Sequence, residues 1–194
     1  FQLYENNGVL KREQVSEYLK NLGQEERKVL RGLGVKFGRY HIFLHRLIKP
    51  EPVSLRTLLW KNYNQKYFNL KPPTFGLNFL EDKEKNKNFM LLCGFEKFDN
   101  FFIRIDILER LFMKIISSNN EMNKEIKMTA EMLNLLGCNK DNFKKLIKKM
   151  NYKITEKNDE VLFRYNPPKN LKKTFHKKAS KENPFRVLRS LNLN

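Results

Sequence analysis

The sequence predicts an α+β fold that is mainly helical, and three observations support this prediction. In two stretches, a pair of short helices with apolar spacing comes directly before two segments in which apolar and polar residues alternate. The composition, with 40% hydrophobic and 12% aromatic residues, is that of a folded chain. A length of 194 residues is enough for one large or two small domains, and we favour two.

The first predicted unit covers residues 1–50. Apolar residues at helical spacing predict one helix that ends at Gly23 and a second over 24–33. Two alternating segments within 35–44 then flank Gly38, which suits the turn of a hairpin. Helix, short turn, helix and hairpin is the order of elements in a winged helix, so we predict a winged-helix-like unit here.

Residues 51–104 are predicted to form a linker helix followed by an irregular segment with a short strand. Pro50 and Pro52 interrupt the preceding pattern, and a helix is expected over 54–63. Beyond it, residues 74–80 alternate like a strand. The apolar residues expected on the buried side of the linker helix are Leu55, Leu58, Leu59 and Trp60.

A second winged-helix unit is predicted over residues 105–166. Thr129 is expected to cap a helix through its hydroxyl group, and Asn139 or Lys140 begins the next helix. The expected order is helix, short extended piece, helix, turn, helix and a hairpin with a polar tip. The residues predicted to lie in the core of this unit are Leu108, Leu111, Phe112, Phe143, Leu146, Ile147 and Met150. The two units are therefore joined by the less regular segment described above.

Residues 167–194 are predicted to be a basic tail that ends in a short helix. Lysines and polar residues dominate the first part of the tail, a composition typical of disorder. Asn183 and Pro184 have the residue types that begin a helix. The apolar residues of this terminal helix suggest that it docks on its own domain or on a neighbouring one.

The net charge of +18 at pH 7 is the most unusual bulk property of the chain. Such a surface attracts polyanions through phosphate neutralisation and counterion release, and nucleic acid is the commonest such partner. The sequence has no apolar run of the ~20 residues needed to span a bilayer, so we expect no membrane partner. Cys93 and Cys138 have no CxxC partner, which indicates a reducing, cytoplasmic location. The first residue, Phe1, suggests a fragment of a longer protein.

Motifs for catalysis and for cofactor binding are missing from the sequence. It contains no G-x-x-x-x-G-K-[ST] loop, so we do not expect this chain to bind and hydrolyse ATP by itself. His41 and His45 are four residues apart, but in a strand and its exit that spacing does not direct two imidazoles to one metal ion. We therefore predict no catalytic residue, no cofactor and no metal in this chain.

Two groups of cations are candidate nucleic-acid ligands. The first group lies on the helix that carries the second unit's apolar stripe: Lys144, Lys145, Lys148 and Lys149. The second group lies in and after the first hairpin: Lys36, Arg39 and Arg46. A solvated or protein-contacting surface is the competing interpretation for both groups. Tyr40 and Phe43 have ring faces on which bases stack, although burial within the hairpin is the commoner situation for such aromatics.

Three stretches of the chain carry a family resemblance. They are LGVKFGRYHIFLHRLIKP with the following SLRTLLW, FFIRIDILERL with MTAEMLNLLGCNKDNFKKLIKKMNYK, and the closing ENPFRVLRSL. Together they resemble the C-terminal region of the Suv3-like ATP-dependent helicases of alphaproteobacteria, superfamily 2 enzymes related to the mitochondrial RNA helicase. The resemblance covers most of the chain and is weakest over 64–100.

The resemblance implies that this chain lies downstream of both motor domains of a longer helicase. ATP, Mg and the strand-separating residues would then belong to the parent protein, and its motor domains would be partners of this chain. The matched positions are turn and tail residues and not catalytic ones: Gly34, Gly38, Pro50, Thr129, Gly137, Cys138, Pro184 and Phe185.

The leading functional hypothesis is a nucleic-acid-binding accessory region of an ATP-dependent helicase, acting on RNA in preference to DNA. The second hypothesis is a protein-docking winged-helix module that makes no direct contact with nucleic acid. A third is a free-standing DNA-binding regulator, which would require a dimer and a palindromic site.

Overall fold

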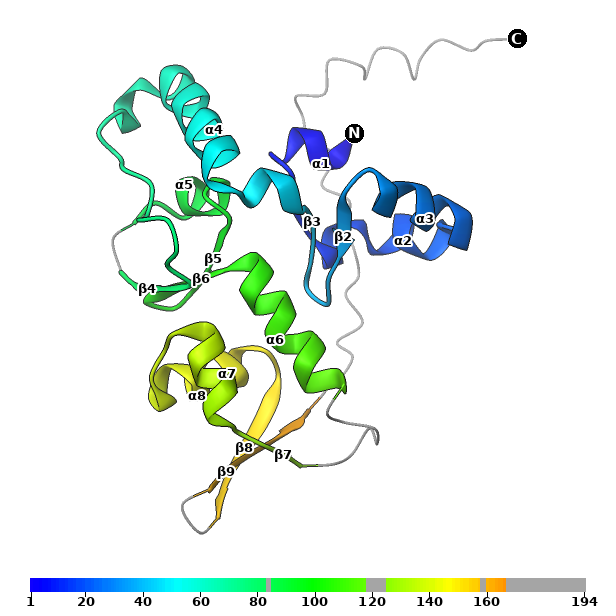
Figure 1. Cartoon of the computed structure of the whole chain (residues 1–194), viewed down its shortest axis with the longest axis vertical. Coiled ribbons are helices and arrows are strands. Elements are labelled where there is room, and N and C mark those ends of the chain that lie inside the picture. The colour runs from blue at the N-terminus through cyan, green and yellow to red at the C-terminus, as the bar shows by residue number, and fades with distance from the viewer. Residues whose placement is uncertain (83–84, 118–124, 158–159, 167–194) are drawn as a thin grey trace, which may run out of the picture.

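A computed structural model of the chain describes residues 1–82, 85–117, 125–157 and 160–166 (Figure 1). The predicted basic tail and its terminal helix lie outside the described residues. The α+β prediction is confirmed, because helices alternate with three small antiparallel sheets of three strands each. Within the described ranges, no helix is both long enough and apolar enough to cross a membrane.

The chain forms three units, and we name them unit 1 (residues 1–48), unit 2 (49–104) and unit 3 (105–166). In each unit the sheet places its last strand between the other two. The elements of unit 1 are α1 (Gln2–Glu5), β1 (Val9–Lys11), the 3-10 helix η1 (Arg12–Val15), α2 (Ser16–Asn21), α3 (Gln24–Gly32), β2 (Val35–Phe37), β3 (His41–Leu44) and the 3-10 helix η2 (His45–Ile48).

Unit 2 is the main difference between the predicted and the observed architecture. Its elements are α4 (Pro50–Tyr63), the 3-10 helix η3 (Gln65–Tyr67), β4 (Phe79–Glu81), α5 (Lys87–Leu92), β5 (Phe95–Phe98) and β6 (Phe101–Arg104). Where the sequence predicted a linker helix and an irregular segment, the chain forms a third sheet with the strand order β4-β6-β5. Its hairpin was missed because its turn, Asp99-Asn100, contains no glycine and because Phe101, Phe102 and Ile103 are all fully buried, so the strand shows no alternation.

Unit 3 follows its predicted order of elements. They are α6 (Ile105–Ser117), β7 (Ile126–Lys127), α7 (Ala130–Leu136), α8 (Lys140–Lys149), β8 (Tyr152–Lys157) and β9 (Glu160–Tyr165). Asn139 begins α8 as its N-cap and accepts a hydrogen bond from the Asn142 backbone N–H at 2.8 Å. Thr129 occupies the N-cap position of α7, but its side chain makes no capping hydrogen bond, contrary to expectation.

One local backbone feature recurs in all three units. A residue with positive φ connects the last helix to the following strand: Gly34 (φ 89°), Gly94 (φ 85°) and Asn151 (φ 64°). Its N–H donates to the carbonyl three residues earlier at 2.9, 2.9 and 3.2 Å, respectively. Glycine and asparagine tolerate this left-handed conformation best, so each helix ends where such a residue stands.

The largest core runs from unit 2 into unit 3. It contains β6, the inner side of α6, α7, α8 and the facing hairpin. All the residues predicted for the core of unit 3 are buried there. A smaller cluster, in which Val9 and Phe43 pack with Ile48 and Ile105, joins unit 1 to the start of α6. Burial of these apolar surfaces holds neighbouring units together.

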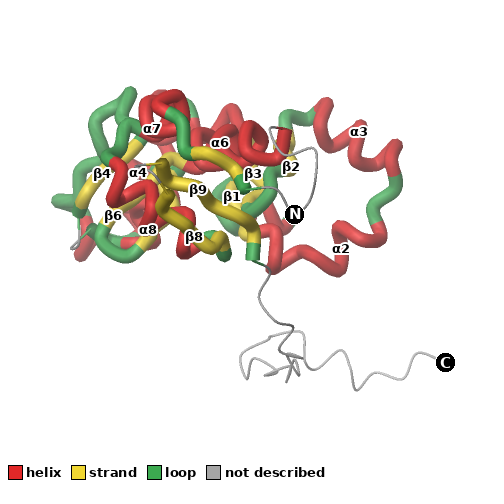
Figure 2. Tube along the Cα trace, turned by 90° about the horizontal axis from the view of Figure 1, so that it is seen from below, coloured by secondary structure: helices red, strands yellow, loops and turns green. Residues whose placement is uncertain are grey.

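Helices α2 and α3 stand away from the rest of the molecule (Figures 1 and 2). No residue of α3 is buried: Val29 is 63% exposed, and Leu33, which follows the helix, is 69% exposed. The predicted first helix is divided into η1 and α2, with Val15 and Leu19 buried. Unit 1 is therefore built around its sheet, and α3 contributes little to its core.

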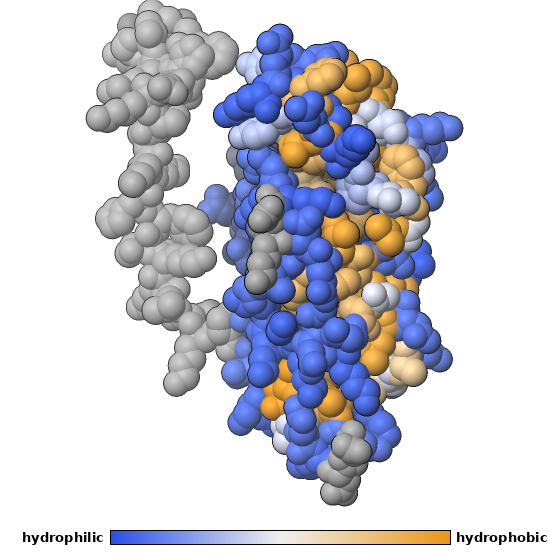
Figure 3. Space-filling model, turned by 90° about the vertical axis from the view of Figure 1, so that its left-hand side faces the viewer, coloured by the Kyte–Doolittle hydropathy of each residue, from blue (hydrophilic) through white to orange (hydrophobic). Residues whose placement is uncertain are grey.

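The predicted orientation of α4 is wrong for its leucines and right for Trp60. Leu55, Leu58 and Leu59 are more than half accessible, whereas Val53 and Thr57 face inward. Trp60 is partly buried and packs against the core cluster that contains Val53 and Phe89. Apolar residues gather at the upper end of the face shown in Figure 3, the end at which Figure 1 places α4. The helix also begins earlier than predicted, because Pro50 occupies its first position, where a missing N–H costs nothing.

Arg56 on the inward side of α4 joins unit 1 to unit 2. Its guanidinium group donates hydrogen bonds to the backbone carbonyls of Asn7, of Leu47 at 2.6 Å and of Leu92 at 2.8 Å. Burial lowers the pKa of Arg56 from its usual value. The three carbonyls come from segments far apart in the sequence, so this one side chain fixes their relative positions.

Candidate functional site

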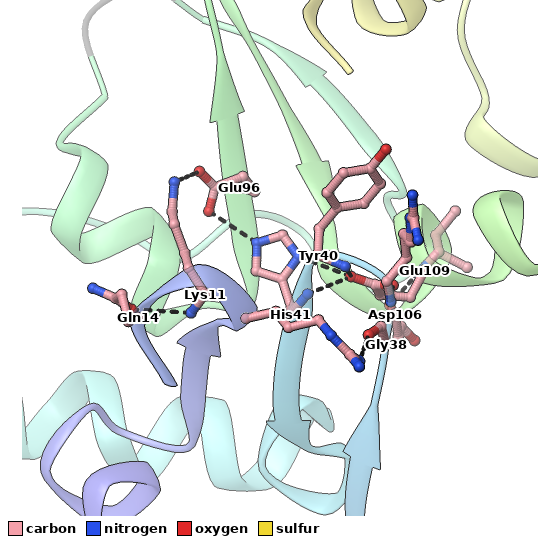
Figure 4. A network of polar contacts seen from close by, with 11 residues as sticks. Lys11, Gln14, Gly38, Tyr40, His41, Glu96, Asp106 and Glu109 are labelled. Atoms are coloured by element: carbon pink, nitrogen blue, oxygen red, sulfur yellow. Dashed lines mark hydrogen bonds and ion pairs between the residues drawn. The ribbon is translucent and has the colours of Figure 1, made fainter. Parts of the chain in front are cut away.

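The tip of the unit 1 hairpin is held by one buried carboxylate. The Glu109 side chain, on α6, accepts hydrogen bonds from the backbone N–H groups of Arg39, of Tyr40 at 2.9 Å and of His41 at 2.7 Å (Figure 4). Gly38 permits this approach, because a Cβ atom at this position would lie 2.3 to 2.8 Å from atoms of the Glu109 side chain. The turn glycine is thus required by packing.

His41 connects this carboxylate to unit 2. Its Nδ1 lies 3.0 Å from Glu109 Oε1, and its Nε2 lies 3.3 Å from Glu96 Oε2. The second oxygen of Glu96 accepts a hydrogen bond from Lys11 Nζ at 2.7 Å. His41, Glu96 and Glu109 are all buried, so the chain Glu109–His41–Glu96–Lys11 forms a polar connection between the three units (Figure 4).

This environment favours the charged forms of its members. Burial alone would lower the pKa of His41, but hydrogen bonds to Glu109 and Glu96 outweigh it and raise that pKa above its usual value of 6.5. Burial likewise opposes the charge on Glu96, but hydrogen bonds from His41 and Lys11 lower the pKa of this carboxyl group. The network therefore favours the imidazolium form of His41 and the carboxylate form of Glu96.

We expect the free energy of unfolding to depend on pH through His41. Because the pKa of His41 is higher in the folded chain, its contribution is complete below about pH 6.5 and is lost as the pH rises through the folded-state pKa. The contribution of Glu96 has the opposite sign and is lost as the pH falls below about 4.5. Urea unfolding between about pH 2 and 10 measures the loss of stability on both the acid and the alkaline side.

The variant His41→Asn is the control for this pH dependence. It should be less stable than the wild type at about pH 6 and should lose the decline on the alkaline side. An alkaline decline of equal size in the variant and the wild type would show that another group causes it.

A cleft of about 530 Å³ opens beside this network. Elements of all three units line it: the end of β1 with η1, the tip of the unit 1 hairpin, β5 of unit 2, and the end of α8 with β9 of unit 3. Its cations are Lys11, Arg12, Arg39 and Lys149, and its carboxylates are Glu13 and Glu96. Positive charge is therefore in excess in the cleft.

Three aromatic side chains, one from each unit, also line the cleft: Tyr40, Phe98 and Tyr165. The Arg39 guanidinium lies over the Tyr165 ring, 5.6 Å from its centre. Phe98 stacks on the buried Phe101 with ring centres 5.9 Å apart. Tyr40 packs edge to face against Phe112, and burial raises the pKa of its hydroxyl group. Phe43, the other aromatic residue considered for stacking, is buried in the core.

The structure brings together two of the seven predicted site residues. Arg39 and Lys149, 110 positions apart in the sequence, line the same cleft. Lys36 on β2 and Arg46 on η2 are exposed but do not line it. Lys149 is itself paired with Asp99 at 2.9 Å.

The other lysines of α8 differ in their partners. Lys144 forms an ion pair with Glu156 at 2.9 Å. Lys145 and Lys148 are exposed, and neither forms an ion pair within the described part of the chain. Lys145 lies one helical turn from Lys149, so α8 extends the cationic surface outward from the cleft.

Sequence reasoning missed several residues of the cleft and its network: Lys11, Arg12, Glu96, Phe98, Glu109 and Tyr165. Glu96 and Glu109 stand in otherwise apolar segments that end up buried, which is the signal that could have identified them. Phe98 and Tyr165 give no local signal, because only the tertiary structure directs them to a shared cleft.

Comparison of the chain with protein-family models, with curated proteins and with solved structures found no match.

Proposed function

We propose that the chain is a nucleic-acid-binding region that acts on RNA in preference to DNA, with its three units as winged-helix-like modules. Each unit has helices followed by a hairpin, with the last strand in the middle of its sheet, as in a winged helix. The resemblance to the C-terminal region of Suv3-like helicases supports an accessory role beside a motor. ATP and Mg would then be bound by the parent protein.

One observation carries this proposal: the basic side chains of α8 form a surface that reaches the cleft, which is also lined by Arg39. Lys145 and Lys148 have no ion-pair partner in the described part of the chain, so their charges are available to phosphates. Residues 1–166 retain 11 of the 18 net positive charges, so the basic character does not arise from the tail alone. Phosphate neutralisation by such side chains gives binding that weakens steeply with salt.

We expect Lys145→Gln with Lys148→Gln to weaken RNA binding and its salt dependence. Each phosphate contact on a single strand contributes about −0.7 to the slope of log K against log salt, so the double variant should lose about 1.4 from the slope. Affinity at about 0.1 M salt should fall roughly tenfold or more. Fluorescence anisotropy with labelled single-stranded RNA measures both quantities on the full chain.

Lys49→Gln with Lys71→Gln is the matched control. Both residues are exposed lysines of unit 2 outside the cleft, and this variant removes the same charge. Equal loss of binding in the two variants would mean that only net charge matters. Absence of binding by the wild type, or affinity independent of salt, would refute the proposal.

A second function, docking to the motor domains of the parent helicase, is favoured by the exposed apolar side of α4. Leu55, Leu59 and Tyr63 follow one another at helical spacing and are 58%, 59% and 91% exposed. Leu55→Ser with Leu59→Ser should abolish association with the motor domains in a pull-down experiment and leave RNA affinity unchanged. Unchanged association would contradict this second function.

A further inference from the structure

The cleft is lined by the planar guanidinium group of Arg39 and by the partly exposed aromatic ring of Phe98. Arg39 lies over Tyr165, 5.6 Å from the ring centre, and forms no ion pair within the described residues. Phe98 stacks on Phe101, is partly exposed and lines the cleft, so part of its ring is accessible to a ligand there. Guanidinium planes and phenyl rings are the surfaces on which unpaired bases stack.

The other cations of the cleft are already engaged. Lys11 is paired with Glu96, Lys149 is paired with Asp99, and Arg12 donates to the Gly38 carbonyl at 2.7 Å. Lys149 is still 56% exposed, so a phosphate can reach it beside Asp99. The Arg39 guanidinium interacts with the Tyr40 hydroxyl group but has no ion-pair partner among the described residues. The cleft therefore offers a guanidinium group without a carboxylate partner, one accessible ammonium group and the partly exposed ring of Phe98.

The size of the cleft limits what it can hold. A volume of about 530 Å³ lies within the range of sites that bind small molecules, roughly 300 to 1,000 Å³. That is suitable for one nucleotide whose base has left the stack. Bases within a duplex are stacked on their neighbours and cannot present a face to Phe98 or Arg39.

We propose that the cleft between the three units binds one unpaired nucleotide of a single-stranded RNA, with its base on Phe98 and the Arg39 plane and its phosphate at Lys149. This inference rests on the proposed RNA-binding function and deepens it, because it assigns the substrate class: single strands in preference to duplexes. Tyr165 is a positioning residue that orients Arg39.

Two conservative variants separate stacking from charge. Phe98→Leu removes the ring and keeps an apolar side chain. Arg39→Lys keeps the positive charge and removes the planar guanidinium group on which a base can stack. Each should weaken single-strand binding by roughly 5- to 100-fold, the range for loss of one stacked base, with the salt slope unchanged. The matched controls Phe68→Leu and Arg31→Lys, at exposed positions outside the cleft, should bind like the wild type. Like Arg39, Arg31 lies over an aromatic ring, that of Phe37.

The experiment uses a single-stranded RNA carrying 2-aminopurine and a duplex of the same sequence, with the full chain at matched salt. We expect tighter binding to the single strand and a change in 2-aminopurine fluorescence that is lost in Phe98→Leu and in Arg39→Lys. Thermal unfolding of each variant verifies its fold, and the exposed Arg39 provides the test if Phe98→Leu is unstable.

The results distinguish RNA binding by the chain as a whole from binding of an unpaired nucleotide in the cleft. Failure of the wild type to bind any RNA would overturn the proposed function and this inference together. Salt-dependent binding that is equal for single strand and duplex, or that is unchanged in both cleft variants, would overturn only the inference about the cleft.

Discussion

Glu109→Ala is expected to lower the free energy of unfolding by about 3 to 5 kcal/mol. The substitution removes the shared acceptor of three backbone N–H groups at the unit 1 hairpin tip and leaves them, together with the His41 imidazolium, without their carboxylate. Removal of one partner from a buried, hydrogen-bonded ion pair typically costs this much. Urea denaturation at neutral pH measures the change.

Glu160→Ala is the comparison for this variant. Glu160 is paired with Lys127 on an exposed surface, and its loss should cost less than about 1 kcal/mol. A loss of similar size in both variants would contradict the view that Glu109 organises the junction between the units.

Arg56→Met is expected to destabilise the chain by roughly 3 kcal/mol. Methionine keeps much of the side-chain volume but leaves the carbonyls of Asn7, Leu47 and Leu92 without a donor. Hydrogen bonds from a charged donor contribute more than neutral ones, and the partly buried carbonyls of Leu47 and Leu92 add a desolvation cost when they lose their donor. The same denaturation experiment measures this loss.

Arg56→Lys tests the geometric part of this expectation. A lysine retains the charge but cannot reach three divergent acceptors with a planar fork, so its stability should lie between those of the wild type and Arg56→Met. A lysine variant as stable as the wild type would mean that the charge alone is sufficient.

The hairpin of unit 1 was predictable from its turn glycine, Gly38, and that of unit 3 from its polar tip. The hairpin of unit 2 has no turn glycine, and its central strand β6 is as uniformly buried as β3 of unit 1. The strand β1 is only three residues long, and nothing in its composition separates it from a loop. Unit 2 was therefore predicted as a linker because it has neither a turn glycine nor alternation in its central strand.

Helix α4 shows a second reason why sequence patterns did not predict the fold completely. Its apolar residues surround much of the helix, so spacing alone does not determine which side faces the core. The side containing Val53, Thr57 and the Arg56 guanidinium packs inward because Arg56 meets three carbonyl acceptors there. The leucines that sequence reasoning placed in the core remain exposed.

The candidate site could be predicted only in part. Basic side chains on α8 and at the first hairpin tip were identifiable from charge and helical spacing. The convergence of Arg39 and Lys149 on one cleft depends on Glu109, which fixes the hairpin tip from a third element. Such long-range contacts leave no periodic signal in the sequence.

Lysine footprinting of the full chain distinguishes RNA binding through α8 from binding through net charge, because it reports on each cation separately. We expect single-stranded RNA to protect Lys145, Lys148 and Lys149 from an amine-reactive ester and to leave Lys49 and Lys71 as reactive as in the free protein. Protection confined to the lysines of residues 167–194, or equal protection at Lys49 and Lys71, would contradict this expectation.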